Sequence, residues 1–177
     1  VVCRRQRQMC IRDRIDITRG NLDPLPIAVS PLFQDDNSKR NSINELKIEN
    51  VGSEISLVVE NNLKISGLFN PLSKEAFLQK PDIAHLKPRF EDWALIKAQA
   101  LITGKVTIED KKLKVEFRLW DILAGREMMA LAFTTVPSNW RRVGHIISDK
   151  VYERLTGEKG YFDTRIIYVS EEGPKTA

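Results

Sequence analysis

The strongest constraint on the fold is a series of alternating segments in the second half of the chain. Apolar residues alternate with polar ones over 102–108 and again over 113–119, with the charged turn 109–112 between them. This pattern predicts a β-hairpin with one buried face. A second turn, containing Gly125, leads into a third strand-like segment at 126–136. The three segments together predict an antiparallel meander.

Two other segments repeat their apolar residues every three or four positions, as one face of a helix does. The clearer repeat predicts a helix over 140–155, capped by Ser138. The earlier repeat predicts a helix over 53–67, capped by Ser53 or Asn50. A glycine stands at the end of each repeat, where a left-handed residue commonly closes a helix.

The remaining elements are shorter and less regular. Residues 26–33 form an apolar run typical of a buried strand, and the polar stretch 34–42 predicts a loop. The other expected elements are a short strand at 68–69, an irregular connection at 71–90 with one short helix near 74–78, and a helical turn at 90–98. The predicted fold class is α/β (α+β), with two layers in which a mixed sheet, including the three-stranded meander, packs against two main helices.

The net charge of +4 is concentrated at the amino-terminal end of the chain. Residues 1–14 hold five arginines and one aspartate, so 28 − 5 = 23 basic and 24 − 1 = 23 acidic residues remain in 15–177. This balance argues against nucleic-acid binding by the body of the chain. We interpret residues 1–14 as a non-native leader, with a disordered basic arm as the alternative. No apolar run is long enough to span a bilayer, so we expect no direct membrane insertion.

Residues suited to catalysis or metal binding are few. Both cysteines, Cys3 and Cys10, lie in the leader, and His85 and His145 are the only histidines. This distribution disfavours a zinc site or a thiol nucleophile, and we expect both histidines to be structural, with His145 at the sheet-facing or exposed side of its helix. No phosphate-binding loop or nucleophile elbow is present. The sequence therefore predicts no enzyme activity, no cofactor and no metal.

Paired carboxylates and tryptophans are further candidates for a functional site. Asp35 with Asp36 falls in the predicted loop and Glu171 with Glu172 in the polar tail, where water would leave such carboxylates unperturbed. The three tryptophans follow helix or strand positions, which favours core packing or an interdomain contact over a stacking platform for bases or sugars. They are Trp93, Trp120 and Trp140.

Several long stretches resemble the amino-terminal domain of the TolB family. They are RIDITRGNLDPLPIAV at 14–29, NNLKISGLFNPL at 61–72, RLWDILAGREMM at 118–129, and NWRRVGHIISDKVYERLTGEKGYFDTRIIYVSEEG at 139–173. The last stretch is the most specific because it is long and its polar and aromatic residues follow a fixed order. Little resemblance is found at 34–49 and 74–89.

The resemblance implies a domain organisation and a role. Residues 15–157 would be the amino-terminal α/β domain, and 158–177 would be a connector and first strand leading into a β-propeller that this chain lacks. The resemblance implies a periplasmic adaptor of the Tol-Pal system. That system serves outer-membrane integrity and envelope invagination at cell division, and is also associated with protein import. The lipoprotein Pal would dock on the absent propeller, so Pal binding by this chain is in doubt.

The resemblance also implies a docking segment for a TolA-like partner near the amino terminus. By position, it comprises Arg14, Ile15, Asp16, Ile17, Thr18, Arg19, Gly20, Asn21, Leu22 and Asp23. Residues 15–18 alternate as an edge strand does, which suits strand pairing with a partner. Two alternatives for this segment remain open. It is an ordinary first strand of the domain sheet, or it switches between the domain sheet and the partner. The alternative function is a small α/β domain that contacts nucleic acid.

Overall fold

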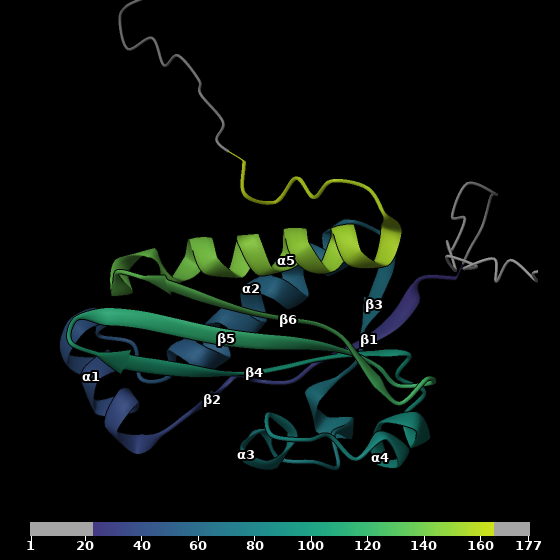
Figure 1. Ribbon diagram of the computed structural model, residues 1–177, viewed down its shortest axis with the longest axis horizontal. Coiled ribbons are helices and arrows are strands. Elements are labelled where there is room, and N and C mark those ends of the chain that lie inside the picture. Colours follow the sequence, from purple (N-terminus) through teal and green to yellow (C-terminus); the bar gives the residue numbers. More distant parts are fainter. Residues whose placement is uncertain (1–22, 165–177) are drawn as a thin grey trace, which may run out of the picture.

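The computed structural model describes residues 23–164, which form one mixed sheet with helices on both faces (Figure 1). The strand order is β3-β1-β4-β5-β6, and β2 also pairs with β4. The strands are β1 (Leu25–Val29), β2 (Phe33–Gln34), β3 (Phe69–Pro71), β4 (Ala100–Glu109), β5 (Lys112–Asp121) and β6 (Arg126–Thr135). The α-helices are α1 (Asp36–Leu46), α2 (Val51–Ile65), α3 (Pro81–Ala84), α4 (Phe90–Leu95) and α5 (Trp140–Thr156). The predicted fold class is confirmed.

The predicted meander is present as β4, β5 and β6, which pair antiparallel in sequence order. The first turn contains Asp110 and Lys111, both with positive φ, and Gly125 provides the positive φ in the second. The other side of the sheet is parallel, because β1 pairs with both β3 and β4 in the same direction. The sheet is therefore mixed, as predicted.

The two predicted main helices, α2 and α5, lie side by side on one face of the sheet (Figure 1). They cover the larger hydrophobic core, to which β4 and β5 contribute alternate residues. The smaller helices α3 and α4 lie on the opposite face, over a second cluster. Helices thus cover both faces of the sheet, with two long helices on one face and two short helices on the other.

The ends of the main helices are set by local geometry. Asn50 caps α2, since its side chain accepts a hydrogen bond from the Ser53 backbone N–H at 3.0 Å. Gly157 closes α5 with φ +80, as predicted. The prediction that Ser138 caps α5 was wrong: Ser138 lies in a 3₁₀ turn, Pro137–Asn139, and Asn139 precedes the helix without a side-chain cap.

The predicted loop at 34–42 was also wrong, because most of it belongs to α1. Asp35 accepts a hydrogen bond from the Ser38 N–H at 2.7 Å and so starts the helix. The side of α1 that meets β4 is polar: Ser38 accepts from the Ile108 N–H at 3.2 Å, and Asn41 donates to the Ile108 carbonyl at 2.8 Å. An apolar repeat was therefore missing from the sequence although the helix packs on β4.

The apolar run 26–33 forms two strands rather than one. Both strands pair with β4, but their registers differ. Val29 aligns with Ile102 and Phe33 with Lys105, so the chain advances four residues from β1 to β2 while β4 advances three. Pro31 lies in the interruption and has no backbone N–H to give to a strand ladder.

The connection at 71–90 contains more helix than was predicted. A 3₁₀ turn, Lys74–Ala76, falls where a short helix was expected, and α3 was not predicted. The short strand β3 and the helical turn α4 are confirmed.

Candidate functional site

Most of the predicted docking segment lies outside the described residues. Of Arg14 to Asp23, the structure describes only Asp23, which is exposed and lies two residues before β1. The strand predicted at 15–18, the leader, and residues 165–177 of the expected connector and first strand also fall outside the described part of the chain. Their structural assignments remain predictions.

The start of β1 sets where the docking segment joins the domain. The Leu25 N–H donates to the Leu68 carbonyl at 2.9 Å, and β1 is paired on both sides, by β3 and by β4. Within the described residues, the pairing of β1 therefore uses no residue of the predicted docking segment.

Residues 139–164, the described part of the most specific stretch of the resemblance, make two sets of contacts. The first joins α5 to α2. The Asn62 amide nitrogen lies 2.9 Å from His145 Nδ1 and donates to Ser148 Oγ at 2.9 Å. Because the amide nitrogen is a donor, this geometry assigns the acceptor role to Nδ1 and the hydrogen to Nε2 of the ring. His145 is structural, but it faces α2 rather than the sheet or solvent as expected.

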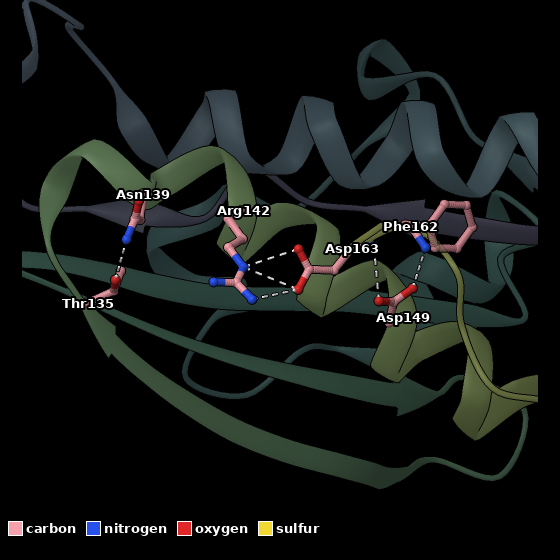
Figure 2. A network of polar contacts seen from close by, with 6 residues as sticks. All are labelled: Thr135, Asn139, Arg142, Asp149, Phe162 and Asp163. Atoms are coloured by element: carbon pink, nitrogen blue, oxygen red, sulfur yellow. Dashed lines mark hydrogen bonds and ion pairs between the residues drawn. The ribbon is translucent and has the colours of Figure 1, made fainter. Parts of the chain in front are cut away.

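The second set fastens residues 158–164, which we call the strap, to the outer side of α5 (Figure 2). The Asp149 carboxylate accepts hydrogen bonds from the backbone N–H groups of Phe162 at 2.7 Å and Asp163 at 3.1 Å. Arg142, two helical turns before Asp149, forms a forked ion pair with Asp163 at 3.1 to 3.2 Å. The hydrogen bonds and charge of Asp163 raise the pKa of Arg142 above its ordinary value.

Aromatic side chains complete the attachment of the strap. The ring of Tyr152 lies 5.5 Å from that of Tyr161, 5.9 Å from that of Phe162 and 6.2 Å from that of Phe69 on β3, in edge-to-face arrangements. Burial of Tyr152, together with the charge of Glu158, raises the pKa of its phenol. The strap therefore contacts a side chain that also belongs to the main core.

The other candidate residues have structural roles. His85 stacks on Phe33 with ring centroids 4.6 Å apart and has Nδ1 3.1 Å from the Pro81 carbonyl. Trp93 and Trp120 are buried and donate to Gln79 and Thr103, both at 2.9 Å. These contacts confirm core packing, and Trp140 also packs, half-buried, against the main core.

The carboxylate pair Asp35 and Asp36 lies at a helix start and not in a loop. Asp35 has a pKa below its ordinary value, chiefly because it accepts hydrogen bonds from Ser38. Asp36 pairs with Lys39 at 3.2 Å on the exposed side of α1. The pair Glu171 and Glu172 lies outside the described residues.

Sequence reasoning missed Gln79 and the fastening pair Arg142 and Asp149. Gln79 accepts from both Trp93 Nε1 and the Arg89 N–H, although it lies in the irregular stretch. The seven-residue spacing of Arg142 and Asp149 places both on one side of α5, which was a usable signal. Among residues 23–164, no group of His, Cys, Asp and Glu has a metal-binding arrangement, and no helix is long and apolar enough to cross a membrane.

The fold and these contacts define an α/β domain, with helices on both faces of a mixed sheet and a polar network that joins segments of its own chain. The sequence matches the TolB amino-terminal domain over residues 13–128, so the chain belongs to that family.

Two relatives agree with this assignment. The Tol-Pal system protein TolB of Pelagibacter ubique (strain HTCC1062) is 80% identical over 162 residues, which are 92% of this chain and 36% of that protein. This chain thus spans about a third of that relative. The crystal structure of TolB from Acinetobacter baumannii has a similar fold, with a TM-score of 0.62 and 22% identity, over 79% of this chain and 30% of the other.

Proposed function

We propose that this chain is a non-enzymatic adaptor domain of the Tol-Pal system in the periplasm. The observation that carries this proposal is its 80% identity to a protein named as a component of that system. A role in outer-membrane integrity, in envelope invagination at cell division and in protein import belongs to the same proposal.

The chemistry of the described residues supports an adaptor over an enzyme. The groups with shifted pKa values make structural contacts: Asp35 starts a helix, Glu116 pairs with Lys114, Arg142 fastens the strap and Tyr152 packs in the core. None of these contacts pairs a nucleophile with a base, which is the arrangement that nucleophilic catalysis uses.

The proposed docking site for a TolA-like partner is Arg14 to Asp23. The segment immediately precedes β1, whose two neighbours already satisfy its pairing. Pairing of this segment with a partner strand would leave the described pairing of β1 intact. Pal docking is assigned to chain beyond these 177 residues.

A pair of deletions tests the docking site. Removing residues 1–23 should abolish binding to TolA and leave the thermal transition nearly unchanged, because β1 and its hydrogen bond to Leu68 remain. Removing only 1–13 is the matched control and should keep binding. Binding retained by the longer deletion would exclude this segment as the docking site. Binding by the isolated chain to Pal would contradict the assignment of Pal to the missing region.

A further inference from the structure

The strap is held by three different kinds of contact within seven residues, which is unusual for a segment that only connects two parts of a protein. Its backbone gives two hydrogen bonds to Asp149, Asp163 forms the forked pair with Arg142, and Phe162 packs against Tyr152. Flexible linkers are rich in small polar residues and make few contacts of this kind.

The path of the strap is also fixed by shape. Gly157 turns the chain with a left-handed φ of +80, and Figure 1 shows the chain running back above α5. At Gly160, a Cβ atom would lie 2.4 Å from Asp149 Cα, so only glycine allows the strap to lie this close to the helix. Polar contacts and close approach therefore centre on the same helical residue, Asp149.

The anchor of the strap is itself rigid. α5 buries Val143, Ile147 and Val151 in the main core, and His145 and Ser148 tie it to Asn62 of α2. A residue fastened to Arg142 and Asp149 is thus held in a set position relative to the sheet.

We propose that residues 158–164 form a fixed joint, which sets the position and direction in which the chain leaves this domain. Displacement of the chain after Thr164 is then transmitted to α5 and through it to α2, instead of being absorbed by a loose linker. The joint acts through a rigid element with defined contacts. This inference does not depend on the Tol-Pal role.

Amide hydrogen exchange on the 177-residue chain tests the joint. In the unsubstituted protein, the amides of Phe162 and Asp163 should be protected although they lie outside helices and strands. Asp149→Ala should accelerate their exchange roughly tenfold or more, the size expected when hydrogen bonds to a charged group are lost. The amides of Ile147 and Val151 should be unaffected.

Two further variants separate the joint from a general loss of stability. Gly160→Ala leaves every polar group in place but puts a methyl group against α5, so it should accelerate the same two amides. Lys150→Ala removes a neighbouring exposed ion pair with Glu153 and is the control that should change neither amide.

Chymotrypsin gives an independent readout, because Tyr161 and Phe162 are its preferred type of cleavage site and Tyr161 is 49% exposed. Cleavage there should be slow in the unsubstituted chain and fast in Asp149→Ala and Gly160→Ala. Unprotected Phe162 and Asp163 amides in the unsubstituted chain would overturn the proposal. So would equal acceleration of the α5 amides in Asp149→Ala, since the strap would then be part of the core.

Discussion

The two faces of the sheet are covered in different ways. On one face, two helices of 15 and 17 residues bury a continuous aliphatic core. On the other, helices of four and six residues cover a small cluster built around Trp93 and Trp120, at one end of the sheet. The larger face relies on apolar area, whereas each tryptophan of the smaller face also needs a hydrogen-bond partner.

This difference indicates which kind of interaction stabilises each face of the sheet. Long amphipathic helices bury enough area to be held mainly by the hydrophobic effect. Helices of one turn have too little apolar surface, so the smaller face depends on a few exact contacts such as Gln79 with Trp93. Substitutions should therefore be costly on the large face through lost volume and on the small face through lost polar partners.

The largest effect is expected for Phe117→Ala on the large face. Phe117 is 1% exposed and stacks on Phe133 at 6.0 Å, so its removal leaves a cavity between β5 and the helices. The expected loss is about 3–5 kcal/mol of unfolding free energy, measured by denaturant titration. Leu131→Ala is the control, because Leu131 lies opposite Phe117 on β6 but is 37% exposed. A similar loss in both variants would contradict the assignment of the core.

A smaller effect is expected for Trp93→Phe on the small face. The variant keeps an aromatic ring near Phe77 but loses the bond from Nε1 to Gln79. We expect a loss of about 1–2 kcal/mol, since Gln79 retains the Arg89 N–H as a donor. Hydrogen exchange should show α3 and α4 opening before the rest. Uniform acceleration across all helices would mean that the two faces unfold as one unit.

A still smaller effect is expected for Gly144→Ala at the contact between α5 and α2. Its Cβ would lie 2.8 Å from Val58 Cγ1, so the helices must separate slightly. Overpacking costs about 1–3 kcal/mol, and the better helix propensity of alanine offsets up to about 1 kcal/mol of this. We therefore expect a net loss of about 1 kcal/mol. Adding Val58→Ala should remove the clash, and thermal unfolding of the double variant should show the coupling. Additive losses would argue against direct contact.

The smallest effect concerns acid pH and Asp35 at the start of α1. Because the folded state lowers its pKa, Asp35 stabilises the protein above its ordinary pKa of about 3.8, and this contribution disappears as pH falls through the lower folded value. Asp35→Asn should lower stability at pH 7, and the difference from the unsubstituted protein should shrink as pH falls through the lowered pKa of Asp35. Chemical denaturation at several pH values checks this. A difference that stays constant with pH would show that the charge is unimportant.

Sequence reasoning predicted the meander, both main helices and the class of fold, because their apolar repeats extend over many residues. It failed where a few polar contacts decide the structure. Residues 34–42 were taken for a loop because the buried side chains of this part of α1 are Ser38 and Ser42, not aliphatic residues. The run 26–33 was taken for one strand because its composition does not show where β4 changes partner.

The candidate site shows the same division. The most specific stretch of the family resemblance is 139–173, and the resemblance implies a docking segment at 14–23, but it does not show what the residues of 139–173 contact. Asp149 meets the amides of residues 13 and 14 positions away, and His145 meets an asparagine 83 positions away. Pairings of this kind leave no periodic signal in the sequence.

The sequence by itself determined the alternation of β4 to β6, the amphipathic faces of α2 and α5, and the balanced charge of the body. These are local properties, since side-chain direction follows from position along a strand or helix. Only the tertiary structure decided that α1 is a helix, that His145 joins two helices and that the strap lies against α5. Those outcomes depend on groups that folding brings together, as when Ser38 accepts a hydrogen bond from Ile108, 70 positions away.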